Sequence, residues 1–334
     1  MKQTLKHILA VYKVKRNRRR LIDFSELEFK QAGKHRPSSN DSLFFAGISK
    51  EGFTFVTRMA FRSDHKNENW LAVSIPSKGI WSFENLSLRE GEGYKQGNLE
   101  YIYIKAREKW QVKYDGKLYQ KDAEQDFKLD VTWTAATPLV HLNEVGISDV
   151  VLGKQISQQN WNWQLKKKLG VLNLLDYEQA GKMAGTLSLN GKDHKLDFIG
   201  IRYHKRGINN WQDRAHHYRI AAVLENGHFL NINLVDYSFL KNQLAAFIYD
   251  DEVVHKIDKI SSLNELDTNL SVSFTLDVKQ EYEEDARQLL IEPLTVFSYH
   301  LTKTYHIKLA EAAFTYDGVK GIGIVEIGRK ATGK

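Results

Sequence analysis

The sequence contains no cysteine and only four prolines in 334 residues. Without cysteine the chain has no disulfide, no thiolate zinc site and no cysteine nucleophile, which fits a reducing compartment such as the cytoplasm. The scarcity of proline and the absence of low-complexity tracts argue against long disordered regions. With 42% hydrophobic and 11% aromatic residues, the composition is that of a folded globular protein, and its length predicts two domains.

Sequence patterns of common catalytic and nucleotide sites are also missing. The chain has no GxxxxGK[ST], GxSxG or HExxH, and "GIGIVE" at residues 321–326 lacks the third glycine and the following helix of a dinucleotide-binding turn. His216 and His217 are adjacent, so on a strand they point to opposite faces and cannot hold one metal together. We therefore expect neither a metal nor a cofactor.

Positive charge is concentrated at one end of the chain. The net charge is +7, yet residues 1–22 hold eight basic side chains and no acid, so the remaining chain is close to neutral. Aromatic and basic residues do alternate in "YIYIKAREKWQVKY", residues 101–114, but Trp110, Val112 and Tyr114 fall on one strand face, which is typical of a core. We therefore expect no nucleic-acid partner.

The N-terminal arm, residues 1–22, has the pattern of a basic amphipathic helix. Four apolar residues recur at i, i+3, i+4 and i+7, and "KVKRNRRR" follows them. This pattern is compatible with contact with an anionic membrane surface, although the apolar run is too short to span a bilayer. A targeting presequence, a nucleic-acid-binding tail, and a solvated tail or docked helix are the alternatives. The side chains expected at the membrane are Leu5, Ile8, Leu9, Tyr12, Arg18, Arg19 and Arg20.

From residue 42 onward the hydrophobic pattern has a period of two. Runs such as "FTFVTRMAF", "FLNINLV" and "SVSFTLDV" predict half-buried antiparallel strands. Tight hairpins are predicted at the four turn pairs Asp115-Gly116, Asn190-Gly191, Asn226-Gly227 and Asp317-Gly318, which supply the positive φ that such turns need.

One segment interrupts the strands near the middle of the chain. Residues 147–182 read as one or two helices with a break at Gly170, and exposed Trp161 and Trp163 beside lysines suit a lid or a membrane interface. We therefore expect a mainly β protein with two antiparallel β-barrels side by side. The expected parts are the arm 1–22, a first β-domain 23–140, a helical connector 141–180 and a second β-domain 181–334.

Three separated motifs resemble the tandem lipocalin-like superfamily, which includes carotenoid 1,2-hydratases, AttH-like proteins, Diels-Alderase-type fungal cyclases and lipid-handling survival-factor proteins. "DYEQAGKMAGTLSLNG" (176–191) resembles the entry to its second barrel, and "GIRYHKRGINNW" (200–211) resembles its Gly-x-Arg-Asp-His-Ser-Trp-Gly signature. "DGVKGIGIVE" (317–326) resembles its closing strand.

The first half also resembles a poorly characterised branch of this superfamily that carries a basic leader, through "DSLFFAGISKEG", "NENWLAVSIP" and "REKWQVKYDGKLY". The signature departs from the family pattern at Tyr203, Lys205 and Arg206, which puts direct transfer of hydratase or cyclase activity in doubt.

The signature segment supplies the candidate site. Arg202 and His204 lie two residues apart and share a strand face, so both project into the same space. By analogy with the family motif, Glu326 is expected to pair with Arg202, because an unpaired buried charge is costly. Two interpretations of the cluster are possible. It is either a structural ion-pair network that holds neighbouring segments together, called the latch below, or the polar end of a ligand cavity. The expected ligand-binding residues are Arg202, His204, Trp211, Arg214, Glu326, Trp110 and Trp133.

The leading hypothesis for function is binding or transport of a hydrophobic lipid or isoprenoid-type ligand, in or between the two barrels. The main rival is a cofactor-independent hydratase, cyclase or isomerase in which His204 or Glu326 moves a proton. A third reading is a structural or interaction module without a ligand. We expect a cytoplasmic protein, with peripheral membrane association through residues 1–22 as an addition.

Overall fold

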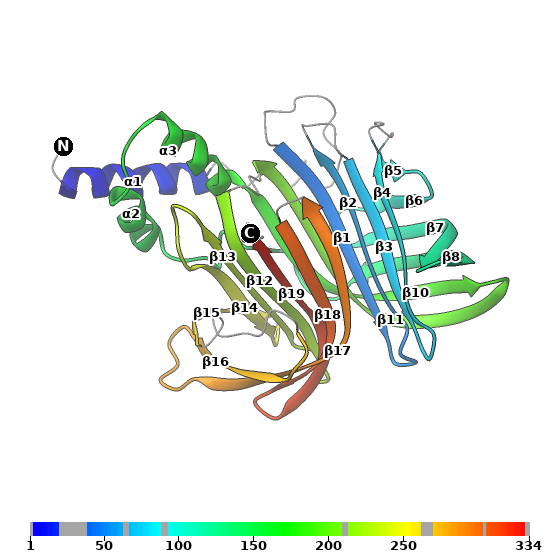
Figure 1. Cartoon of the computed structure of the whole chain (residues 1–334). Coiled ribbons are helices and arrows are strands. Elements are labelled where there is room, and N and C mark those ends of the chain that lie inside the picture. The colour runs from blue at the N-terminus through cyan, green and yellow to red at the C-terminus, as the bar shows by residue number, and fades with distance from the viewer. Residues whose placement is uncertain are drawn as a thin grey trace. The chain divides into compact units, whose positions relative to one another are not determined.

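The computed structural model describes residues 3–19, 39–62, 67–87, 93–208, 213–261, 270–302 and 305–330. They are mainly β, as the alternation predicts, and divide into two compact units (Figure 1). Unit 1 is drawn from residues 1–22, 141–174 and 210–334, and unit 2 from residues 23–140 and 175–209.

Unit 1 contains a closed antiparallel barrel of eight strands, in the order β12 to β19, in which β19 pairs with β12. Its strands are β12 (Arg214–Leu224), β13 (Phe229–Tyr237), β14 (Gln243–Asp250), β15 (Val253–Ile260), β16 (Phe274–Gln280), β17 (Arg287–Thr302), β18 (Tyr305–Tyr316) and β19 (Val319–Lys330). Closure removes the free edges of the sheet. The "GIGIVE" strand closes the barrel, as the resemblance implied.

Local sequence explains this barrel well. Alternate residues of β12, such as Ile220 and Leu224, enter an apolar core with Ile291 and Val325. Two of the four predicted turn pairs serve this unit, and Asp317 and Gly318 have φ values of 49° and 80°, as a tight hairpin requires.

The helices of unit 1 pack together beside β13 (Figure 1). They are α1 (Gln3–Arg19), α2 (Asp149–Ser157), α3 (Trp163–Lys168) and the 3-10 helix η2 (Leu169–Asn173). Ser148 and Asn162 cap α2 and α3 by accepting backbone N–H bonds. Ala10 and Val14 of α1 are buried against α2, so α1 docks on its own unit.

Unit 2 is a curled antiparallel sheet in the order β4-β3-β2-β1-β11-β10-β8-β7-β6-β5. Its strands are β1 (Ser39–Ser49), β2 (Thr54–Arg62), β3 (Asn67–Ile75), β4 (Gly79–Ser87), β5 (Tyr94–Gln96), β6 (Leu99–Lys105), β7 (Lys109–Gln120), β8 (Ala123–Ala135), β10 (Leu175–Leu189) and β11 (Lys192–Ile208), while the short β9 (Val140–His141) follows β8. A pairing of Ser82 with Tyr119 links β4 to β7, so the sheet also turns back on itself.

The interior of this curled sheet is occupied by large side chains. Phe45, Trp110, Trp133 and Phe198 belong to one apolar cluster and are buried. Phe45 packs edge-on against Tyr101 and lies 6.3 Å, between ring centroids, from Trp133. Close packing of this kind places protein atoms inside the curled sheet.

Two local predictions were wrong. The predicted helical segment 147–182 ends early, because residues from Leu175 onward form β10, which is bonded on both sides by β8 and β11. Asp115-Gly116 is no turn but lies within β7, opposite Lys128 and Phe127 of β8. A β-carbon at Gly116 would lie 2.3 Å from Asn98 Nδ2, so glycine serves close packing there.

The division of the chain also differs from the expected one. The hairpin of β10 and β11, residues 175–208, pairs with β1 and β8 and therefore belongs to unit 2. We expected residues from 181 onward to form the second β-domain. A one-dimensional pattern indicates strands but not their partners, which is why the non-local return of this hairpin was missed.

Candidate functional site

A polar cluster lies on the inner face of unit 2, on β11 and its two neighbours. In the ladder, Arg202 is opposite Phe45 and His204 is opposite Leu43, and both of these apolar residues belong to the interior cluster. On the other side β10 places Tyr177 opposite His204. The expectation that Arg202 and His204 share a face is therefore confirmed.

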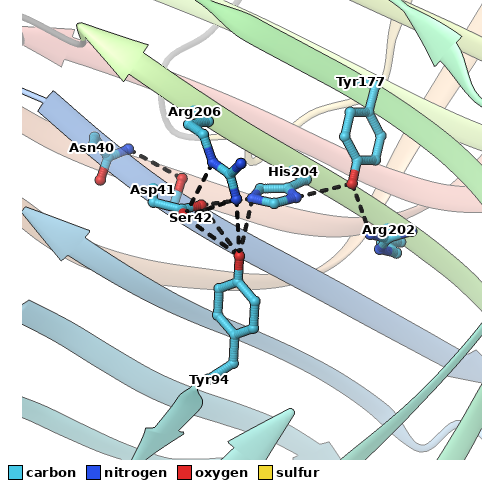
Figure 2. A network of polar contacts seen from close by, with 8 residues as sticks. All are labelled: Asn40, Asp41, Ser42, Tyr94, Tyr177, Arg202, His204 and Arg206. Carbon is cyan, nitrogen blue, oxygen red and sulfur yellow. Dashed lines mark hydrogen bonds and ion pairs between the residues drawn. The ribbon is translucent and has the colours of Figure 1, made fainter. Parts of the chain in front are cut away.

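A continuous chain of hydrogen bonds joins these side chains (Figure 2). Arg202 Nη2 donates to Tyr177 OH at 2.9 Å, Tyr177 OH lies 2.9 Å from His204 Nδ1, and His204 Nε2 lies 2.6 Å from Asp41 Oδ1. Because a carboxylate only accepts, the network assigns the ring proton to Nε2, and Nδ1 accepts from Tyr177. Every bond thus points from Arg202 toward Asp41.

Two further side chains surround the Asp41 carboxylate. Arg206 Nε donates to Asp41 Oδ2 at 3.2 Å, and Tyr94 OH donates to the same oxygen at 3.4 Å (Figure 2). Tyr94 comes from β5, whereas Asp41 and Arg206 face each other across β1 and β11. The cluster therefore joins four strands, β1, β5, β10 and β11.

The electrostatics keep Asp41 ionised and His204 neutral. Burial alone would raise the pKa of Asp41, but His204 and Arg206 outweigh it and lower that pKa below its ordinary value. Burial lowers the pKa of His204, and the neighbouring Asp41 opposes this only in part. Burial raises the pKa of Tyr94, so its hydroxyl stays protonated.

Aromatic rings enclose the Arg202 guanidinium. Its carbon lies 4.9 Å from the Trp110 ring centroid, 5.4 Å from that of Trp133 and 5.3 Å from that of Tyr177. Its Nη1 donates to Gln179 Oε1 at 3.0 Å. Four expected site residues, Arg202, His204, Trp110 and Trp133, are thus brought together, and all four are buried. Such an arrangement suits the latch reading and can also move a proton along its length.

The other expected site residues lie elsewhere. Glu326 and Arg214 are buried in unit 1, where Glu326 Oε1 lies 2.6 Å from His217 Nε2 and the Arg214 guanidinium lies 5.9 Å from the Tyr237 ring centroid. The pairing of Arg202 with Glu326 stays a prediction. Trp211 lies outside the described residues.

A second candidate site is an apolar groove in unit 1 between α1 and the segment that holds α3 and η2. Its volume is about 660 Å³, within the range of roughly 300–1,000 Å³ that small-molecule pockets occupy. Leu9, Ile156, Leu165 and Leu172 supply apolar walls. The Trp161 ring adds a further wall and is fixed by its Nε1, which donates to the Ile156 carbonyl at 3.1 Å.

Helix α1 presents one apolar face to its own unit and another to solvent. The docked face carries Ala10 and Val14, whereas the predicted membrane stripe is exposed: Leu5 by 48%, Ile8 by 57%, Leu9 by 37% and Tyr12 by 60%. The side chains of Arg18 and Arg19 and all of Arg20 lie outside the described residues. Within the described part of the chain, no helix has the length and apolar character needed to cross a bilayer.

Sequence reasoning missed Asp41, Tyr94, Tyr177, Gln179 and the whole groove. Tyr177 and Gln179 stand in the quoted "DYEQAG" motif, so a register that placed β10 beside β11 would have found them. Asp41 and Tyr94 come from strands far away in the sequence and carried no local signal. The groove is built from residues 9–16 and 156–172, which the sequence does not bring together.

Residues 26–331 match the family model DUF7064, described as a domain of unknown function. No curated protein matches the sequence. The fold is similar to the crystal structure of a presumed AttH from Nitrosomonas europaea, with a TM-score of 0.57 and 14% identity over 89% of this chain and 98% of that one. It is also similar to the crystal structure of CghA, with a TM-score of 0.54 and 8% identity over 89% of each chain. These likenesses agree with an AttH-like, lipocalin-like fold.

Proposed function

Since this chain belongs to the DUF7064 family, whose domain has no known function, we propose a function from its own structure: it binds a hydrophobic ligand of the lipid or isoprenoid type. The observation that carries the proposal is the groove of about 660 Å³ beneath α1. Burying a methylene group contributes roughly 0.8 kcal/mol, so an apolar chain laid in such a groove is held mainly by the hydrophobic effect.

The proposed ligand site differs in place from the barrel interior that the sequence pointed to. In unit 2 the interior is packed with aromatic residues such as Phe45, Trp110 and Trp133, and in unit 1 the barrel holds its own apolar core. The groove has apolar walls and open volume together, which is what an exchangeable ligand requires.

Two matched variants of α1 test the proposal. Leu9 lines the groove and Leu5 does not, although both are exposed leucines of the same helix. We expect native mass spectrometry of the full chain, after mixing with C12 to C16 amphiphiles, to detect a one-to-one complex. Leu9→Gln should weaken it several-fold while Leu5→Gln leaves it unchanged. Failure of every amphiphile to bind, or equal effects of the two variants, would refute the groove as the site.

We also propose that α1 lies on an anionic membrane surface. Its exposed apolar stripe and its basic residues Lys13, Lys15 and Arg16 support this contact, since exposed lysines and arginines near an anionic surface contribute about 1 kcal/mol each. A membrane-adjacent groove would receive a lipid-type ligand directly from the bilayer. This addition concerns the partner of α1 and can fail independently of ligand binding.

A cofactor-independent hydratase, cyclase or isomerase is the second candidate. The chain from Arg202 through Tyr177 and His204 to Asp41 favours it, because its bonds all run one way and a proton can move along it. Catalysis requires His204 to meet a substrate. If the site opens to solvent, hydrogen–deuterium exchange at the His204 C2 position, measured by mass spectrometry, should proceed at a rate close to that of an exposed histidine such as His255. Persistent protection would leave the cluster as a structural latch.

A further inference from the structure

Three cationic side chains stand at the apolar groove of unit 1. Lys13 and Arg16 come from α1, one turn apart, and Lys166 comes from α3. All three side chains are exposed. In the described part of the chain, no ion pair includes any of them. The groove therefore combines apolar walls with three cations at its edge that form no ion pair with the described carboxylates.

Aromatic rings hold two of these ammonium groups beside the groove. Lys13 Nζ lies 4.9 Å from the Trp161 ring centroid, and Lys166 Nζ lies 4.9 Å from the Trp163 ring centroid. A cation over an aromatic face is attracted to it without losing its charge or its capacity to donate hydrogen bonds. Both ammonium groups thus remain able to bind an anion.

The surrounding helices strengthen the positive potential. Residues 3–19 and 149–173 together contain ten Lys and Arg and a single acid, Asp149. Clustered charge of one sign raises the local concentration of oppositely charged ligands and speeds their arrival. The charge of these two segments is therefore predominantly positive.

We propose that the groove binds a single-chain amphiphile with an anionic head group, with the apolar chain against Leu9, Leu165 and Leu172 and the head group at Lys13, Arg16 and Lys166. This inference rests on the proposed function and specifies its ligand class. A carboxylate and a phosphate ester share the required chemistry, because ammonium and guanidinium groups bind both. A neutral ligand of the same chain length would occupy the apolar part and leave the cations unused.

Isothermal titration calorimetry of the full chain tests this inference with dodecanoate, dodecyl phosphate and 1-dodecanol as probes. At low ionic strength both anions should bind about tenfold more tightly than the alcohol, since each exposed ion pair contributes roughly a 1.5- to 5-fold gain. Added salt should reduce this advantage because it screens exposed charges. The ratio between the carboxylate and the phosphate then identifies the preferred head group.

Substitutions at the rim separate the head-group site from the groove. The combined Lys13→Gln, Arg16→Gln and Lys166→Gln variant should bind anions and alcohol alike, whereas Lys15→Gln, an exposed position of α1 that does not line the groove, should keep the preference. Equal affinity of the unmodified chain for all three probes would overturn the anionic preference but retain the groove. Binding of none of them would overturn the proposed function as well.

Discussion

Gly153 of α2 lies directly against Val11 of α1: a β-carbon at position 153 would stand 2.4 Å from Val11 Cγ2 and 3.0 Å from the Val11 backbone nitrogen. The missing side chain lets the two helices approach closely, and this contact fixes which face of α1 is docked. As a result Ala10 and Val14 are buried, while the stripe that includes Ile8 and Tyr12 stays exposed. Gly153 thus contributes to the orientation of α1 on which both the groove and the proposed membrane contact depend.

Gly153→Ala is predicted to loosen α1. By helix propensity alone this change would stabilise α2 by about 0.5–1 kcal/mol, but the clash with Val11 should outweigh that gain, since overpacking costs roughly 1–3 kcal/mol. Limited trypsin digestion should then cleave at Lys13 and Arg16 several-fold faster. Lys154→Ala, at the neighbouring exposed position, is the control. A Gly153→Ala variant that resists trypsin as well as the unmodified chain would contradict the docked arrangement.

The neutral state of His204 makes stability depend on pH. Burial lowers its pKa in the folded chain below the ordinary 6.5, so as the pH falls the unfolded chain takes up this proton first. The contribution is therefore complete well above pH 6.5 and is lost as the pH falls below it, by at most about 1.4 kcal/mol per pH unit. The lowered pKa of Asp41 also makes the folded chain less stable as the pH falls, but only below about pH 3.8, the ordinary pKa of an aspartate.

Urea unfolding at pH 7.5 and pH 5.5, followed by tryptophan fluorescence, measures this dependence. His204→Gln should be less stable at pH 7.5 but should lose less stability between the two pH values than the unmodified chain. The same pH dependence in both proteins would mean that folding does not shift the pKa of His204. A smaller loss of stability in the unmodified chain than in the variant would mean that His204 is charged in the folded state, against the tautomer assigned from the Asp41 contact.

Tyr177→Phe is predicted to break the hydrogen-bond chain in the middle. The hydroxyl accepts from Arg202 and donates to His204, and its removal leaves two buried polar atoms without this partner. Such a loss typically costs about 1–3 kcal/mol, measured as a lower free energy of unfolding. Tyr119→Phe, which removes a hydroxyl from an exposed tyrosine of the same unit, should have little effect. Equal effects of the two changes would indicate that the chain contributes nothing specific.

Liposome flotation is predicted to depend on Ile8. The side chain is exposed on α1 and does not line the groove, so Ile8→Gln should reduce binding to vesicles with anionic lipid without changing ligand affinity. Val253, a similarly exposed apolar residue of β15, supplies the control variant Val253→Gln. If the unmodified chain fails to float with anionic vesicles, or floats equally with neutral ones, the membrane proposal is wrong.

Much of the fold could be predicted from the sequence because antiparallel strands and their hairpins leave local patterns in the sequence. Alternation and turn pairs such as Asn190-Gly191, with φ values of 48° and 79°, specify hairpins from a few residues. Which strands pair with each other could not be predicted in the same way. The return of β10 and β11 to β1 depends on contacts far apart in the chain, and the sequence near residue 180 indicates neither the partner nor the unit.

The candidate site was predictable only where its residues share a strand. Arg202 and His204 were found because two-residue spacing fixes their common face, and Trp110 and Trp133 because large aromatic residues suit an interior. Asp41 could not be found, since an acid near the start of a strand is ordinary and its partners lie on β11. The N-terminal arm illustrates the same limit. Its helix was expected, but the docked face was not, because Ala10 and Val14 have small side chains that do not give a clear hydrophobic pattern in the sequence.

Photo-crosslinking with a diazirine-bearing fatty acid, followed by peptide mapping of the full chain, tests the central claim of a ligand groove most directly. The structure predicts labelled peptides from residues 9–16 and 156–172, with labelling competed away by unmodified dodecanoate. Competed labelling confined to barrel strands, such as β7 and β8 around Trp110 and Trp133, would contradict the groove and place the ligand inside unit 2 instead.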